Sequence, residues 1–261
     1  MASFQFDQAE GLRRMLGACG GSRIVSVFAA APCPDKGAIL LNLAAMLARA
    51  GSSVLVLDAC PGGRGFCAGQ RQSPRATLAQ AARRECALED AVMELPSGVR
   101  VAVLGAPGAQ PGLDAVFARL AQQADVVLVD AEAGADGGLP LAAMADGEFV
   151  IQASPGPQAI MAAYAIVKRL YASLGRRPFG VLVTGAPETA ARQVYGNMAQ
   201  AAARYLGVEL HCLGWVPPDE HLERAARLGR PVVEAFPLAG ASVAFRHLAG
   251  RFARGTALLE A

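Results

Sequence analysis

The chain has 261 residues, of which 53% are hydrophobic and 18% charged, and its formal net charge is +2. This length is enough for one large α/β domain with a full core, and the small net charge, without a basic block, argues against a nucleic-acid-binding protein. The apolar residues occur in runs of about five to eight rather than about twenty, which is typical of buried parallel strands and not of membrane spans.

The cysteines carry no metal-binding or disulfide pattern. There are six, scattered without a CxxC pair: Cys19, Cys33, Cys60, Cys67, Cys86 and Cys212. The three histidines lie late in the chain and do not cluster. The sequence therefore predicts no zinc site and no disulfide framework, and it favours a reducing, cytoplasmic environment. Residues 1–14 lack a basic stretch followed by an apolar one, so we expect no signal peptide.

In chain order, the predicted elements begin with a short amphipathic helix at 4–16, which a Gly-Gly link separates from the rest. Strands and helices then alternate. The strands are expected at 24–28, 53–58, 100–104, 125–130, 148–153, 179–184 and 210–215. The helices are expected at 36–50, 74–92, 111–123, 157–175, 189–206, 219–228 and 240–256. This alternation predicts an α/β fold with a doubly wound, mostly parallel sheet and helices on both faces. We expect one α/β domain over 22–261, preceded by a helix and linker at 1–21.

The first strand, loop and helix form the kind of unit in which a phosphate-binding loop usually lies. Lys36 ends this loop, Asp58 closes the second strand and Asp130 closes the fourth. Ligands of such sheets bind at the carboxyl ends of the strands. Lys36 is accordingly a candidate phosphate ligand, and both aspartates are candidates for binding magnesium-bound water. The alternative is structural: Lys36 begins a helix capped by Asp35, and the aspartates form turns.

Taken together, several segments resemble the MinD/ParA family of deviant-Walker ATPases, in its FlhG/FleN branch of flagellar-number regulators. DQAEGLR at 7–13 is similar to the DQAxxLR signature of that branch. ADVVLVDAEAG at 124–134 is similar to the segment leading into switch II, and SPGPQAIMAAYAIVKRL at 154–170 matches a further family segment. The tail at 205–249 resembles the family's ending, so the likeness covers nearly the whole chain. It implies a MinD/ParA-like P-loop NTPase fold.

The loop before the first long helix departs from the family pattern KGGxGK[ST]. Pro32 and Pro34 carry no N–H with which to cradle phosphate, Asp35 brings a negative charge, and Gly37 has no hydroxyl for magnesium. Only Lys36 is retained.

Two other parts of the implied nucleotide site are also altered. Cys60 stands where the family has the aspartate that positions the attacking water, and Val183-Thr184-Gly185 replaces an asparagine near the adenine. We expect Cys60 to be a buried, unreactive thiol. These departures predict a pseudo-ATPase with no catalytic residue and no cofactor. An active ATPase that binds ATP and Mg²⁺ through an unorthodox loop is the alternative.

The resemblance implies a partner for the N-terminal helix, namely an FlhF-type GTPase whose GTP hydrolysis it stimulates. The motif residues that carry this role are Asp7, Gln8, Ala9, Leu12 and Arg13. Periodicity alone favours the other interpretation, a helix packed on its own domain. Flagellar switch-complex proteins and a flagellar transcriptional regulator are further partners that the family implies.

The C-terminal segment leaves two interpretations open. Val243, Leu248 and Phe252 are expected to share an apolar face flanked by Arg246, Arg251 and Arg254. Such a stripe can lie peripherally on the inner membrane or dock on the sheet. A third functional alternative for the whole chain is a cellulose-synthesis or septum-site relative of the same superfamily, which would lack the DQAxxLR helix.

Overall fold

A computed structural model describes residues 22–30, 35–70, 72–105 and 110–253. The predicted N-terminal helix, with the motif at 7–13, lies outside these residues, as do the prolines at 32 and 34 and the arginine at 254. The predicted division between a segment at 1–21 and a domain at 22–261 stays a prediction.

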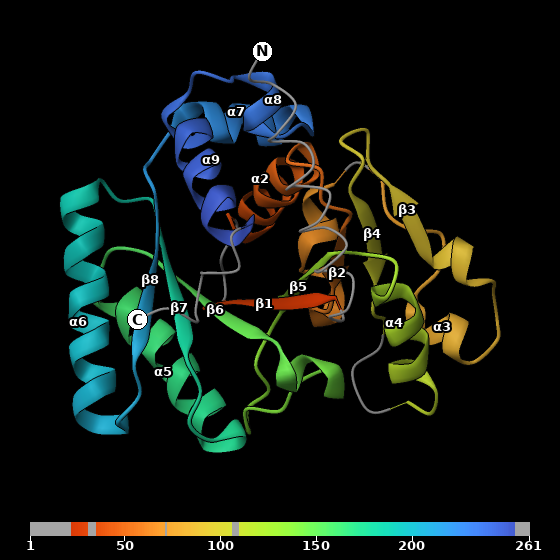
Figure 1. Ribbon diagram of the computed structural model, residues 1–261, viewed down its shortest axis with the longest axis horizontal. Helices are drawn as coiled ribbons and strands as arrows, with labels where there is room; N and C mark the ends of the chain where they lie inside the picture. The colour runs from red at the N-terminus through yellow and green to blue at the C-terminus, as the bar shows by residue number, and fades with distance from the viewer. Residues whose placement is uncertain (1–21, 31–34, 71, 106–109, 254–261) are drawn as a thin grey trace, which may run out of the picture.

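The described chain is organised around an eight-stranded sheet with the order β3-β4-β2-β5-β1-β6-β7-β8 (Figure 1). Its strands are β1 (Arg23–Ala29), β2 (Val54–Asp58), β3 (Val92–Glu94), β4 (Arg100–Val103), β5 (Val126–Ala131), β6 (Glu148–Ala153), β7 (Phe179–Thr184) and β8 (Leu210–Val216). The pair β3–β4 is antiparallel, and the other neighbouring pairs are parallel. The central strands β2, β5 and β1 are rich in Val, Leu and Ile because both faces of the sheet are covered.

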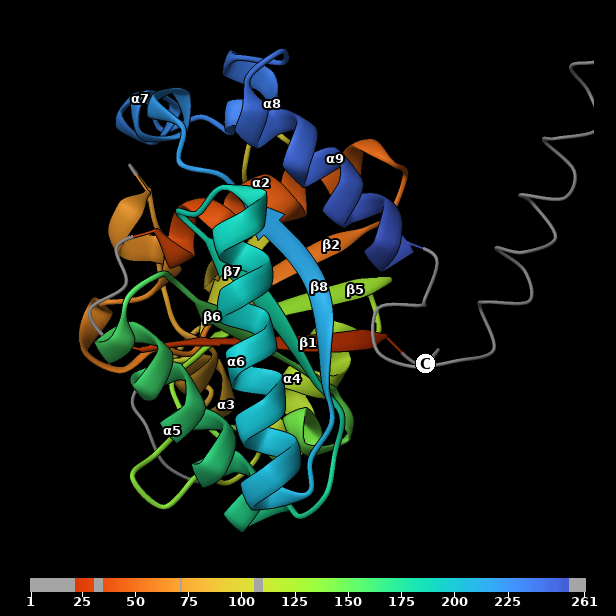
Figure 2. The ribbon, with the colours of Figure 1, turned by 90° about the vertical axis from the view of Figure 1, so that its left-hand side faces the viewer.

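Helices cover both faces of the sheet (Figures 1 and 2). One apolar core joins it to α2 (Lys36–Arg49), α7 (Glu220–Leu228), α8 (Val232–Ala235) and α9 (Gly240–Ala253). The opposite core joins it to α3 (Leu78–Ala82), α4 (Leu113–Ala121), α5 (Pro157–Leu174) and α6 (Glu188–Leu206). Short 3-10 turns lie at Pro61–Gly63, Phe66–Gly69, Leu88–Ala91 and Ala142–Asp146. The predicted α/β fold with helices on both faces is confirmed.

The seven predicted strands are confirmed, but the helix expected at 74–92 is wrong. Thr77 begins α3 with a capping box to Gln80, and the helix ends after a few residues. Arg84 adopts a left-handed conformation with φ 61°, while Glu85 N–H donates to the Gln80 carbonyl. This is a Schellman ending without the usual glycine, so no helix-stop signal is visible in the sequence there. The chain after it forms a 3-10 turn and the antiparallel strand β3, which was also not predicted; nor was the short helix α8.

The apolar face of α9 is buried inside the protein. Phe245, Leu248 and Phe252 belong to the core shared with α2, whereas Val243 is 38% exposed. The expectation that Val243 shares the face of Leu248 and Phe252 is therefore wrong, because five helical residues at about 100° each turn the side chain well away. Docking on the sheet is confirmed for 240–253. Among the described helices, none is long and apolar enough to cross a bilayer.

This packing predicts that one substitution on α9 strongly lowers the stability of the protein, while another two residues away hardly changes it. Phe245→Ala removes a fully buried ring and should lower the free energy of unfolding by about 3–5 kcal/mol. Val243→Ala is the matched control and should change it by less than about 0.5 kcal/mol. Urea unfolding of the two variants measures both values, and equal losses would contradict the docked arrangement of the helix.

Candidate functional site

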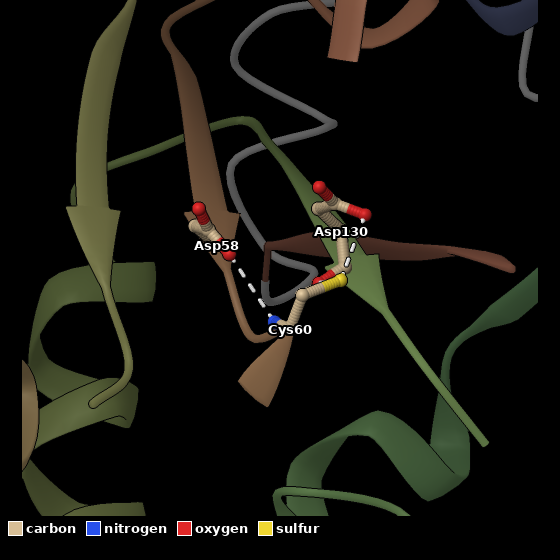
Figure 3. A group of neighbouring side chains, drawn as sticks. All are labelled: Asp58, Cys60 and Asp130. Atoms are coloured by element: carbon tan, nitrogen blue, oxygen red, sulfur yellow. Dashed lines mark hydrogen bonds between the residues drawn. The ribbon is translucent and has the colours of Figure 1, made fainter. Parts of the chain in front are cut away.

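The carboxyl edge of β2 and β5 brings the predicted site residues together, as the sheet topology requires. Asp58, the last residue of β2, and Asp130, the last but one of β5, are paired in direct register. Lys36, the first residue of α2, reaches the same place and pairs with Asp130, with Nζ 2.5 Å from Oδ1. Cys60, which follows β2, lies between the two aspartates (Figure 3).

Lys36 is turned inward. Its side chain is buried, with only 7% of the residue exposed, and its Nζ donates to the Ala131 carbonyl at 3.0 Å and to Cys60 Sγ at 3.4 Å. Burial alone would lower the pKa of Lys36, but the charge of Asp130 and the contacts to Cys60 outweigh it and raise the pKa. The ammonium is therefore charged at neutral pH and already neutralised by a carboxylate of the protein.

Asp35 precedes α2 without capping it. It occupies the N-cap position, but its backbone is helical and its side chain makes no capping hydrogen bond. The alternative interpretation was that Lys36 begins a helix capped by Asp35. The start of the helix at Lys36 is confirmed, and the cap is wrong. An N-cap side chain must lie outside the helical conformation to reach the free N–H groups, and Asp35 does not.

Cys60 is buried, as expected, and it contacts both charged partners. Its Sγ lies 3.3 Å from Asp130 Oδ1 as well as 3.4 Å from Lys36 Nζ. Burial, followed by the charge of Asp130, raises the pKa of the Cys60 thiol to about 12. A thiol with this pKa is protonated at neutral pH, which makes it a poor nucleophile. The sequence places Cys60 at an altered position of the implied site, but its contacts with Lys36 and Asp130 were not predicted.

Asp58 is held by the loop that follows it. Its carboxylate accepts backbone N–H groups from Cys60 at 3.2 Å and Cys67 at 2.8 Å. Burial raises the pKa of Asp58, the Cys67 N–H opposes the rise, and the charge of Asp130 adds to it. The loop approaches so closely that a Cβ on Gly65 would lie 2.0 Å from Asp58 Oδ1. The carboxylate therefore organises the loop over 60–67.

Two hollows flank the start of α2. One, of about 300 Å³, is lined by Lys36 and Asp130 together with Asn42, Arg64 and Arg230, among others. The second, of about 640 Å³, has a partly acidic wall that contains Asp35, Thr184, Asp219, Glu220 and Glu223. The first hollow thus carries the basic side chains of Arg64 and Arg230 beside the Lys36–Asp130 pair.

Comparison with known proteins identifies the family. Antiactivator FleN of Pseudomonas aeruginosa is 30% identical over 248 residues, which are 90% of this chain and 88% of FleN. The chain belongs to the FlhG/FleN branch of the MinD/ParA family. No family model matches this FleN-type chain.

Solved structures show the same fold. MinD of Aquifex aeolicus has a TM-score of 0.67 at 19% identity, covering 89% of this chain and 97% of MinD. The MinC:MinD complex of the same organism gives 0.69 at 20% identity, over 92% and 99%. MinD of Pyrococcus horikoshii complexed with Mg-ADP gives 0.62 at 19% identity, over 88% and 96%. At these identities the likeness concerns the fold alone.

In the arrangement that the structure shows, the side chains at this edge do not fit a magnesium-bound nucleotide. Lys36 is paired with Asp130 and is not free to meet a phosphate. Both oxygens of Asp58 are engaged by backbone N–H groups, and Gly37 brings no hydroxyl. A bound triphosphate would have to break a buried ion pair, which is a costly change.

The close approach of Gly65 to Asp58 gives a test of this loop. Gly65→Ala places a methyl group inside the carboxylate's space and should lower the free energy of unfolding by about 1–3 kcal/mol. Gly69→Ala, in the same loop, meets nothing within 4 Å and is the control. Chemical unfolding compares the two, and a Gly65→Ala variant as stable as Gly69→Ala would show that Asp58 does not hold the loop.

Proposed function

We propose that this FleN-type chain regulates the number or placement of flagella through contacts with other proteins. The observation that carries the proposal is the 30% identity to antiactivator FleN over nearly the whole of both chains. The fold supports it, because MinD, which shares this architecture, has been solved in complex with MinC. A flagellar transcriptional regulator and the flagellar switch complex are the corresponding partner classes here.

We further propose that the segment at 7–13 binds an FlhF-type GTPase and stimulates its GTP hydrolysis. The sequence DQAEGLR supports this through its likeness to the signature of the branch. Ala9, Leu12 and Arg13 are spaced three and four apart, so a helix would carry them on one face, which is the usual form of a helix that docks in a partner's groove.

The nucleotide site is proposed to be inactive. Three features support this: the Lys36 ammonium is committed to Asp130, Cys60 is a protonated thiol where the family has a water-positioning aspartate, and Gly37 has no hydroxyl. One observation favours the rival, an active ATPase: Lys36, Asp58 and Asp130 still meet at one edge of the sheet beside a hollow of about 300 Å³.

The partner proposal predicts a gain in GTP hydrolysis when the full chain is added to the FlhF-type GTPase of the same species. Leu12→Asp should weaken the stimulation about 30-fold, because it buries a charge at the centre of the interface. Glu10→Ala, at a variable position of the motif, is the control and should leave the stimulation intact. The steady-state rate of phosphate release measures both, and a full chain that leaves the GTPase rate unchanged would refute the proposal.

The nucleotide proposal predicts that calorimetric titration with Mg–ATP shows no binding tighter than about 1 mM. Lys36→Ala should then behave like the unchanged chain. The rival function predicts micromolar binding that Lys36→Ala abolishes, so the same pair of titrations separates the two functions.

A further inference from the structure

A cluster of three side chains at the end of β2 and β5 has the composition of a cation site. One ligand atom each from Asp58, Cys60 and Asp130 can be chosen so that all three lie within 4.8 Å of one another, and all three residues are buried. The Oδ2 atom of Asp130 is buried and has no hydrogen-bond partner among the described residues. Asp130 is also among the residues that line the 300 Å³ hollow. A buried carboxylate oxygen without a donor is costly and marks a place where positive charge is favoured.

The protein itself supplies a cation to the Asp130 carboxylate, at its other oxygen, Oδ1. Lys36 Nζ lies 2.5 Å from Asp130 Oδ1 and 3.4 Å from Cys60 Sγ. Its third contact, to the Ala131 carbonyl, belongs to the same strand end. Three acceptors thus surround an ammonium group that has three N–H donors.

The ion pair of Lys36 and Asp130 also connects two elements of the fold. Lys36 begins α2 and Asp130 belongs to β5, so the ion pair links the start of a helix to the centre of the sheet. Cys60 extends the link to the segment after β2. The edge is held together by the chain's own groups.

We propose that the Lys36 ammonium is the resident cation beside Asp130 and Cys60, taking the place that a divalent metal ion would otherwise occupy in the cluster of Asp58, Cys60 and Asp130. The lysine acts as a structural counterion rather than as a ligand for phosphate. Part of this inference overlaps the proposal of an inactive nucleotide site. Its test, however, reads metal binding and stability, whereas calorimetry with ATP reads the nucleotide proposal.

Replacing Lys36 by an uncharged side chain should leave a site that binds a metal ion. In Lys36→Met, the Cys60 thiol and the Asp130 carboxylate remain without a cation, and a thiolate together with a carboxylate suits Zn²⁺. ZnCl₂ at about 100 times its Kd should raise the Tm of this variant by about 5 °C, reversibly on addition of EDTA. The unchanged chain should show no such rise. The double variant Lys36→Met/Cys60→Ser, which lacks the thiol ligand, is the control for zinc bound elsewhere and should lose the effect.

A second measurement keeps the inference testable if Lys36→Met folds poorly. Lys36→Met and Asp130→Asn each leave one buried charge unpaired, so each should lower Tm, while the double variant should unfold above either single variant. Additive losses in this cycle would overturn the proposal. So would a zinc-dependent rise in Tm of the unchanged chain equal to that of Lys36→Met, or a folded Lys36→Met that zinc does not stabilise.

Discussion

The buried pair of Lys36 and Asp130 is the interaction on which the arrangement of this edge depends. Each partner has lost almost all contact with water, and neither charge is tolerable there without the other. The pair positions the start of α2 against the end of β5 and holds the Cys60 thiol between them. The charge of Asp130 outweighs the effect of burial and raises the pKa of Lys36, whereas the pKa of Cys60 is raised mainly by burial and further by the charge of Asp130.

The helices on the same face of the sheet impose a second constraint. The apolar side of α2 packs on α9, whose Phe245, Leu248 and Phe252 complete that core. These three side chains are buried in the core and are therefore not available to another ligand. Within 240–253 they stabilise the fold. A membrane contact through them would require the helix to leave the sheet, with the loss of this buried area.

Membership in the MinD/ParA family describes the fold of this chain, whereas the side chains at the ligand edge describe what can bind there. The fold matches MinD structures over most of the chain at about one-fifth identity, because many sequences can form the same layered core. The ligand edge tolerates far less, since every donor there must face its partner. A chain can therefore keep the family architecture while its ligand edge carries other side chains, here Cys60 and Gly37 beside the retained Lys36.

The sequence by itself determined the succession of the seven parallel strands and of most helices between them, because apolar β-branched runs bounded by turns are local signals. It placed Asp58 and Asp130 at the ends of strands and Lys36 at the end of the first loop. The tertiary structure decided what those residues do. The register of β2 on β5 and the position of α2 on the sheet decide whether Lys36 points outward or pairs with Asp130. They also decide whether Cys60 lies close to both charged side chains. Such contacts join residues far apart in the chain, and no local pattern encodes them.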